Sequence, residues 1–370
     1  MALPKAYFHV LPTDRLGYQH NLINIAQGFR ALGIPFESSA DYWREPNGNL
    51  LFKANPDADP RDFDVVLCSE QYQVYGNGSL PEAFFSSPGK KVFFYTGDGV
   101  MFHKAMKNPY YRKFDHILAF QYDGLPYPDN VHGWTFGMSQ HMIDLAMPDT
   151  PKNPFICINY RNGHSVRNLS QKVLFDQLNP SQIDNTIESH DWSSYRDSPD
   201  YEEYLVYQSA GRHHRSYRQR IASSVATSTF GGHFYIKPWI WNWLTFKIAN
   251  YFVESAASIG RMNKLFKSIG LHTDHTYRIY QWDSWRLWEA FAAGSMAINV
   301  DFEKYHIRLP EMPVNHEHYL GVDLRNPQKA LSVLNNPTQM EEIGIQGREW
   351  ALRHYSPQAQ AERLLKIMNL

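Results

Sequence analysis

The chain has 370 residues, of which 43% are hydrophobic, and its formal net charge at pH 7 is −1. This length favours two domains, and the apolar content is sufficient for two hydrophobic cores. A sequence pI of about 7.0 excludes the basic field typical of nucleic-acid-binding proteins. With only two cysteines, a disulfide scaffold is excluded as well.

Neither a targeting segment nor a membrane span is evident. Residues 1–10 lack the basic start and long apolar core of a signal peptide. No stretch reaches the ~18 uncharged apolar residues that cross a bilayer. We therefore expect a cytoplasmic protein that is at most peripheral to a membrane.

Apolar runs and helical stretches alternate in the first part of the chain, as in an open parallel sheet. A helical pattern over 19–32 ends at Gly33, but residues 16–18 do not complete a dinucleotide fingerprint. We predict a Rossmann-like domain over residues 1–150, without NAD. The strand-like runs are residues 6–11, 34–38, 64–69, 91–95 and 117–121.

Three side chains near the predicted strand ends are candidates for a general base. They are His20, Glu70 and Asp98. Open α/β sheets bind ligands at the carboxyl ends of their strands, and all three positions fit that location. Helix capping or packing explains His20 equally well, and an Asx turn between two glycines explains Asp98.

A polar, proline-containing stretch over 147–154 predicts a domain boundary. A strand over 155–159, a loop and a helix from about Ser165 follow it, which predicts a second Rossmann-like domain over 151–345. Further along, the hydroxyls of 217–232 and the N–H groups of Gly231 and Gly232 could hold phosphate or base. Ordinary turn chemistry is the alternative for these glycines.

Residues 238–270 are rich in tryptophan and other aromatic residues, and they carry scattered lysine and arginine. The pattern predicts one or two amphipathic helices inserted into the second domain. Packing against the domain explains such helices. The alternatives are a peripheral membrane or lipid-linked acceptor contact and a dimer contact.

The most informative segment is 279–300. Asp283 or Ser284 can cap a helix that begins near Trp285, so that the positive end of this helix faces a ligand such as a diphosphate. Arg286 adds a cation, and Glu289 lies one turn further on, where its carboxylate can accept two ribose hydroxyls. Gly294 ends the helix, and residues 296–300 read as a buried strand.

Residues 283–294, Asp-Ser-Trp-Arg-Leu-Trp-Glu-Ala-Phe-Ala-Ala-Gly, resemble the donor-site motif of GT-B glycosyltransferases. The exostosin-like and CgeB-like group is the most similar, with its Ser-x-Arg-x-x-Glu-Ala-x-Ala-x-Gly pattern. The resemblance implies the GT-B fold, in which two Rossmann-like domains with parallel sheets face each other across a cleft. It also implies that the last helices, here 346–370, cross back to the first domain.

The same resemblance implies roles for individual residues. Arg161 and Arg286 would contact the donor diphosphate, and Glu289 would hold the ribose. His20 resembles the early histidine that serves as base in some inverting enzymes. Retaining enzymes of the glycogen-synthase type carry a further glutamate where this chain has Gln281.

No histidine, cysteine or carboxylate spacing indicates a metal site, and GT-B enzymes generally need no metal. We therefore expect a cytoplasmic, metal-independent glycosyltransferase with no cofactor, whose partners are a nucleotide-diphosphate sugar and a glycan, lipid-linked or other hydroxyl acceptor. A fucosyltransferase-like enzyme using a GDP-sugar is one alternative. A catalytically silent GT-B protein acting as a binding or scaffold module is the other.

Overall fold

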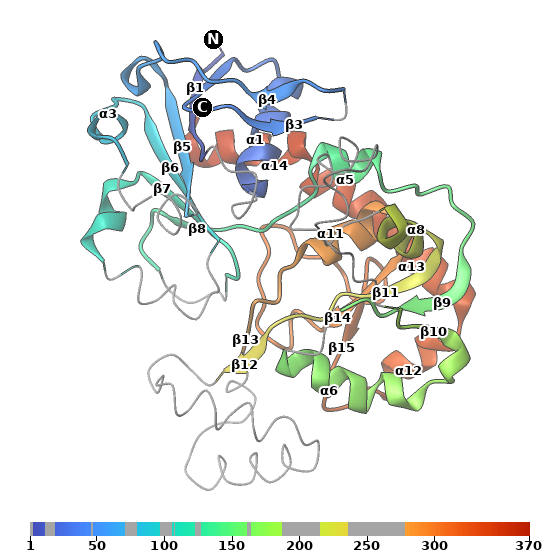
Figure 1. Ribbon diagram of the computed structural model, residues 1–370. Helices are drawn as coiled ribbons and strands as arrows, with labels where there is room; N and C mark the ends of the chain where they lie inside the picture. The colour runs from blue at the N-terminus through green and yellow to red at the C-terminus, as the bar shows by residue number, and fades with distance from the viewer. Residues whose placement is uncertain are drawn as a thin grey trace, which may run out of the picture.

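The computed structural model describes most of the chain and shows two α/β domains (Figure 1). The expected aromatic insertion at 238–270, Asp98 and Arg161 lie outside the described residues. The described residues are 3–11, 19–45, 47–70, 80–96, 106, 108–122, 127–160, 164–186, 215–235 and 278–370.

The first domain is built on a six-stranded parallel sheet in the order β2-β1-β5-β6-β7-β8. Its buried apolar side chains divide into two clusters, one including residues of α1 and the other residues of α3. The elements are β1 (Ala6–His9), α1 (His20–Ala31), β2 (Phe36–Ser38), β3 (Tyr42–Arg44), β4 (Leu50–Phe52), β5 (Val65–Ser69), α3 (Glu82–Phe85), β6 (Lys90–Tyr95), β7 (His116–Ala119) and β8 (Val131–Gly133).

The second domain contains a five-stranded parallel sheet in the order β10-β9-β11-β14-β15. A short antiparallel pair, β12 and β13, extends from it. The elements are α5 (Gln140–Asp144), β9 (Asn153–Cys157), α6 (Ser165–Val173), β10 (Ile183–Asp184), α8 (Arg215–Ser223), β11 (Ser224–Ser228), β12 (His233–Tyr235), β13 (Arg278–Tyr280), α11 (Trp285–Ala292), β14 (Met296–Val300), β15 (Leu320–Val322), α12 (Gln328–Leu334) and α13 (Pro337–Tyr355). The last helix, α14 (Pro357–Met368), belongs to the first domain.

Both sheets are doubly wound. In each of them the first strand along the chain lies between the second and the third, which is the strand order of Rossmann-like and flavodoxin-like domains. This confirms the predicted α/β class with two Rossmann-like parallel sheets. Residues 12–18, 71–79, 97–105 and 161–163 lie outside the described residues, so the cleft between the sheets stays a prediction.

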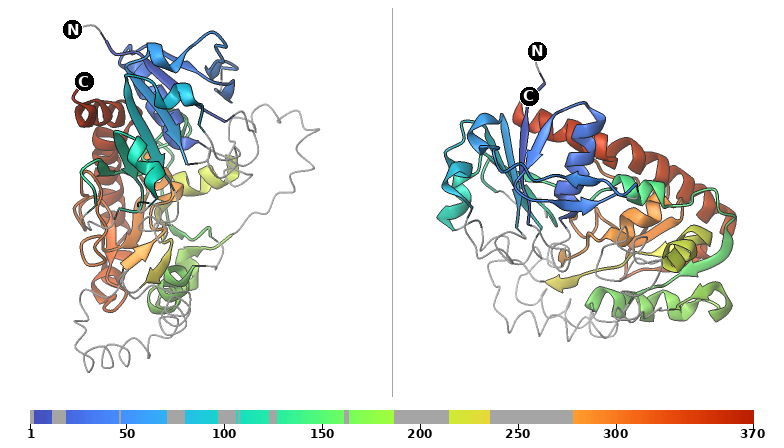
Figure 2. Two further views of the ribbon diagram at one scale, coloured as in Figure 1. Left: turned by 90° about the vertical axis from the view of Figure 1, so that its left-hand side faces the viewer. Right: turned by 45° about the horizontal axis from the view of Figure 1, so that its top comes forward.

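Within the described residues the chain crosses between the domains twice, and the two crossings lie side by side. The backbone N–H of Met138 donates to the carbonyl of Tyr355 over 2.9 Å. Before the second crossing, α13 packs on β11 and β14 of the second domain. After it, α14 packs on α1 of the first domain. Figure 2 shows these two red helices running along one side of both domains. The return to the first domain therefore occurs at Ser356, where the helical pattern breaks before Pro357.

The contact between α1 and α14 depends on a glycine. A Cβ atom on Gly28 would lie 2.2 Å from the carbonyl oxygen of Pro357 and 2.6 Å from the Cβ of Ala361. We expect Gly28→Ala to lower the free energy of unfolding by about 1–3 kcal/mol through overpacking, although alanine is the better helix former. Urea denaturation measures this change. Lys366→Ala on the exposed side of α14 is the control, and a Gly28→Ala variant as stable as this control would contradict the close packing.

Some boundaries differ from the sequence prediction. Met138, Met142 and Ala146 belong to the hydrophobic core of the second domain, although they precede residue 151. Helix α13 begins at Pro337, with the side chain of Asn336 accepting a hydrogen bond from the N–H of Gln339. Among the described residues, no helix is long and apolar enough to cross a membrane.

Candidate functional site

The second sheet has its topological switch point between β9 and β11. The helix α6 that follows β9 leads to β10 on one side, whereas the later strands lie on the other side. Ligands of open α/β domains bind in the crevice at the carboxyl ends of such strands. Tyr160 and His164 follow β9 here, and Gly231 follows β11. These residues therefore occupy the position expected for a ligand site.

Helix α11 begins at the same edge of the sheet. Ser284 is its N-cap residue by backbone conformation, but the Ser284 side chain makes no capping hydrogen bond. The Ser284 Oγ atom is buried, and within the described ranges it has no hydrogen-bond partner. Buried hydroxyls in proteins are nearly always hydrogen-bonded, so this hydroxyl is a candidate ligand contact.

Arg286 is the second residue of α11. Its guanidinium lies over the Tyr160 ring, with 5.7 Å from Cζ to the ring centroid. Its Nε atom is buried without a hydrogen-bond partner, and in the part of the chain that the structure describes Arg286 forms no ion pair. A half-buried cation without a counter-ion at a helix N-terminus favours an anionic ligand.

Arg167 adds a second positive charge that the sequence interpretation missed. Its guanidinium also stacks on Tyr160, at 4.8 Å, and its Nε donates to the carbonyl of Phe230 over 2.8 Å. The two arginines thus lie on one aromatic ring between the ends of β9 and β11. The sequence did contain a signal for this contact, because Arg167 lies in the first turn of the helix that follows β9.

His164 and the glycine turn hold the crevice together. The Nδ1 atom of His164 accepts a hydrogen bond of 2.7 Å from the N–H of Gly232. Burial, Arg167, His233 and Arg286, in that order, lower the pKa of His164 to about 4, so the ring is neutral at pH 7. The N–H of Gly232 is therefore occupied by a protein acceptor. Its predicted contact with the donor stays a prediction.

The two glycines are required by close packing. Gly232 has φ +87°, and a Cβ there would lie 2.0 Å from the carbonyl oxygen of Tyr280. For Gly231, the corresponding distance to the carbonyl oxygen of Gln281 is 2.9 Å. The turn after β11 is thus pressed against the chain leading into α11. Gln281 itself adopts a left-handed conformation, with φ +56°.

Glu289 lies on α11, one turn after Arg286. Its Oε2 atom accepts a hydrogen bond of 2.8 Å from the hydroxyl of Tyr217 on α8, and Glu289 is only 5% exposed. Burial, followed by the charge of Glu289, raises the pKa of Tyr217 well above its usual value. The carboxylate is therefore fixed in place by a buried partner. Its role in holding ribose stays a prediction.

Asp283 is enclosed by hydrogen-bond donors from both domains. Its carboxylate is 4% exposed, and protein donors reach both of its oxygens: Thr135 and Phe136 at Oδ2, and the Trp288 indole at Oδ1. Burial raises the pKa of Asp283 to about 6, because its effect exceeds that of the hydrogen bonds, which lower the pKa. The structure therefore shows a structural contact for this carboxylate, and the predicted donor contact stays a prediction.

Two of the three base candidates are described. His20 is 1% exposed, and its Nε2 atom lies 3.1 Å from the carbonyl oxygens of both Phe136 and Gly137. Nε2 therefore donates, which leaves Nδ1 as the atom that could accept a proton. Glu70 follows β5 and accepts a hydrogen bond of 3.3 Å from Thr96. The structure does not bring these two residues into contact with each other.

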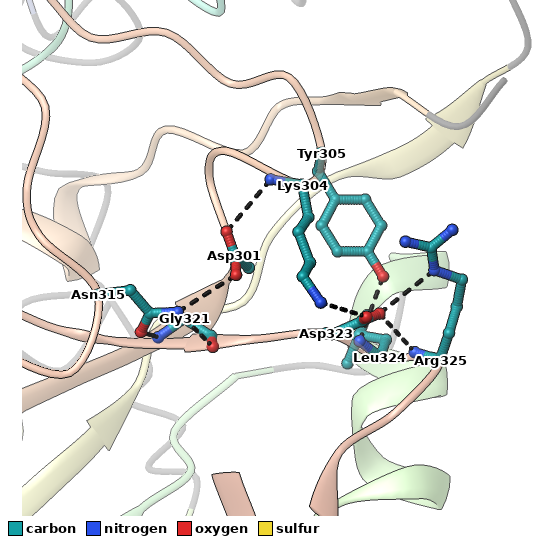
Figure 3. Close-up of polar contacts among 8 residues, drawn as sticks. All are labelled: Asp301, Lys304, Tyr305, Asn315, Gly321, Asp323, Leu324 and Arg325. Atoms are coloured by element: carbon teal, nitrogen blue, oxygen red, sulfur yellow. Dashed lines mark hydrogen bonds and ion pairs between the residues drawn. The ribbon is translucent and has the colours of Figure 1, made fainter. Parts of the chain in front are cut away.

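The loop after β14 is held by charged contacts at the carboxyl edge of the sheet (Figure 3). Asp323 accepts hydrogen bonds from Lys304 at 2.8 Å and from the backbone and side chain of Arg325. The carboxylate of Asp301 accepts a hydrogen bond from the side-chain amide of Asn315. This polar cluster fixes the loop without involving Arg286.

Two doubly wound sheets with a cationic site at a strand crevice define this chain as a two-domain α/β protein. No protein-family model matches the sequence, and no curated protein shows a significant match. Identities near 10% and TM-scores below 0.5 link it to solved structures without assigning a family. Among these structures are HepE of Anabaena with UDP and glucose (TM-score 0.49, 11% identity, 99% of each chain), sucrose-phosphate synthase of Thermosynechococcus elongatus (0.45, 11%, 99% of this chain and 98% of that chain) and a DNA-modifying β-glucosyltransferase (0.42, 10%, 99% and 100%).

Proposed function

We propose that this protein is a glycosyltransferase that moves a hexosyl group from a nucleoside diphosphate sugar to a hydroxyl acceptor. The observation that carries the proposal is Arg286, a half-buried guanidinium that in the described structure forms no ion pair. It lies at a helix N-terminus and at the switch point of a Rossmann-like sheet. Diphosphates bind where these two features coincide.

The site suits the chemistry of a departing diphosphate. In glycosyl transfer the bond between the anomeric carbon and a diphosphate oxygen breaks, and the electron pair stays on the diphosphate. A planar guanidinium binds phosphate oxygens in a bidentate manner, and the N–H groups at the start of α11 favour negative charge. Arg286 and Ser284 would therefore stabilise the leaving group, with Arg161 as a further predicted contact.

The finer assignment rests on the motif around Arg286. Its resemblance to the exostosin-like and CgeB-like group supports GT-B chemistry without a metal. His20, with its Nδ1 as the proton acceptor, and Asp98 are the proposed bases if the reaction inverts the anomeric configuration, and Glu70 is a third candidate. His20 lies beside α11, with its ring 6.1 Å from that of Trp285. This contact with the first residue of α11 supports His20 as a candidate base.

Binding of nucleotides tests the proposal directly. We expect at least one of UDP, GDP, ADP and dTDP to raise the melting temperature of the protein, and CMP, with its single phosphate, to have a smaller effect. A response to GDP alone would favour a fucosyltransferase-like enzyme. No response to any of these nucleotides would overturn the proposal and favour a catalytically silent protein.

The ribose contact of Glu289 can be separated from its structural contact. Glu289→Gln retains an acceptor for the Tyr217 hydroxyl but loses the charge, and we expect about tenfold weaker nucleotide binding. Tyr217→Phe keeps the charge of Glu289 but removes the hydrogen bond to it, which lowers the free energy of unfolding by about 1–3 kcal/mol and weakens nucleotide binding less than Glu289→Gln does. Calorimetric titration of both variants checks this. Equal affinities for the two variants would exclude a ribose role for Glu289.

A further inference from the structure

The carboxylate of Asp283 joins the two domains. Thr135 donates its hydroxyl hydrogen to Oδ2 over 2.5 Å, and the N–H of Phe136 donates to the same oxygen over 2.8 Å. Both donors lie just beyond β8 of the first domain. The Trp288 indole donates to Oδ1 from within α11, over 2.8 Å. One buried side chain therefore ties the start of α11 to the end of the first sheet.

Two further contacts reinforce this connection. Gln121, which follows β7, accepts a hydrogen bond from the N–H of Asp283 over 3.0 Å and donates to its carbonyl over 3.2 Å. The side-chain amide thus pairs with the Asp283 backbone as a neighbouring strand would. Two residues later, the Trp285 ring lies 6.1 Å from His20 and 6.2 Å from Phe136. The chain is held to the first domain immediately before and immediately after Ser284.

We propose that Asp283 is a positioning residue: its interdomain hydrogen bonds hold the N-terminus of α11 so that Ser284 and Arg286 face the strand ends where a nucleoside diphosphate binds. The inference rests on the proposed function of that site. The donor-binding end of α11 is thereby coupled to the orientation of the first domain, although Thr135 and Gln121 do not contact the donor.

The coupling has a defined physical basis. If only part of the population holds α11 in the binding orientation, the observed dissociation constant equals the intrinsic one divided by that fraction. Removing an acceptor for Thr135 or Phe136 lowers the fraction without changing any group at the anion site. Affinity for a diphosphate should therefore fall when the contact is broken from either domain.

Two isosteric variants break the contact from opposite sides. In Asp283→Asn an amide NH₂ group replaces one carboxylate oxygen. It then faces a donor group: either the Trp288 indole N–H, or the Phe136 N–H and the Thr135 hydroxyl. At least one hydrogen bond is therefore lost, or its donor and acceptor are exchanged. Thr135→Val removes one hydroxyl on the first domain. Ser139→Ala is the matched control, because Ser139 is equally buried and its hydroxyl contacts His141, not Asp283.

The experiment measures UDP, GDP, ADP and dTDP affinity together with hydrogen exchange in the absence of nucleotide. We expect Asp283→Asn and Thr135→Val each to weaken binding of the preferred diphosphate about 5- to 10-fold, with the double variant no weaker than Asp283→Asn alone. Amides at 284–288 should exchange faster in both variants. Ser139→Ala should bind like the wild type.

The outcomes separate the two proposals. If Thr135→Val binds like Ser139→Ala and amide exchange at 284–288 is unchanged, the positioning role of Asp283 is wrong. If the wild type binds none of the four diphosphates, the proposed function fails, and faster exchange at 284–288 in Thr135→Val then shows only that the interdomain contact orders α11. If Asp283→Asn does not fold, Thr135→Val decides alone.

Discussion

Arg286→Met is expected to weaken binding of the preferred nucleoside diphosphate about 10- to 100-fold, because hydrogen bonds to a charged group contribute about 1.5–3 kcal/mol. The variant should remain as stable as the wild type. The Arg286 guanidinium of the wild type forms no ion pair in the described structure, so the substitution leaves no buried carboxylate without its partner. Calorimetric titration gives the affinity, and thermal unfolding gives the stability.

Arg220→Met is the matched control for this experiment. Arg220 also lies in the second domain, but its guanidinium pairs with Asp184 over 2.8 Å. Its loss should lower stability and leave nucleotide affinity unchanged. Arg286→Lys should fall between the wild type and Arg286→Met, because lysine retains the charge but not the planar fork. Unchanged affinity in Arg286→Met would remove the main support for the proposed function.

Gly232→Ala is expected to have the largest effect on stability. Alanine at φ +87° is strained, and its methyl group would lie 2.0 Å from the carbonyl oxygen of Tyr280. We expect the free energy of unfolding to fall by about 3 kcal/mol or more, since backbone strain alone costs of order 1–3 kcal/mol. Chemical denaturation followed by fluorescence measures the loss.

Gly231→Ala provides the comparison for Gly232→Ala. Its methyl group would lie 2.9 Å from the Gln281 carbonyl, and Gly231 does not have a positive φ. The loss of stability should therefore be clearly smaller. If both substitutions left stability unchanged but abolished nucleotide binding, the glycines would be ligand contacts, as their sequence pattern also allowed.

Much of the fold was predictable from local patterns. Apolar runs such as 64–69 and 296–300 became β5 and β14 because a strand in a parallel sheet is buried on both faces. The helix after Ser284 was equally clear, since a polar turn precedes an apolar stripe that ends at a glycine. These signals come from residues close together in the chain.

The site was less predictable, because its contacts join distant residues. The hydrogen bond between Thr135 and Asp283 spans 148 positions, and that between Tyr217 and Glu289 spans 72. An acidic residue before a helix reads as a cap or a ligand contact when its neighbours are unknown. Only the folded arrangement shows that Asp283 points into the first domain whereas Arg286 lies beside Tyr160.

The two adjacent chain crossings limit how the domains can move. The N–H of Met138 is bonded to the carbonyl of Tyr355, so the two connections lie next to each other. Adjacent connections favour a hinge rotation at this place over sliding of one sheet past the other. The distance between the proposed donor and acceptor sides would then be set by a single opening angle.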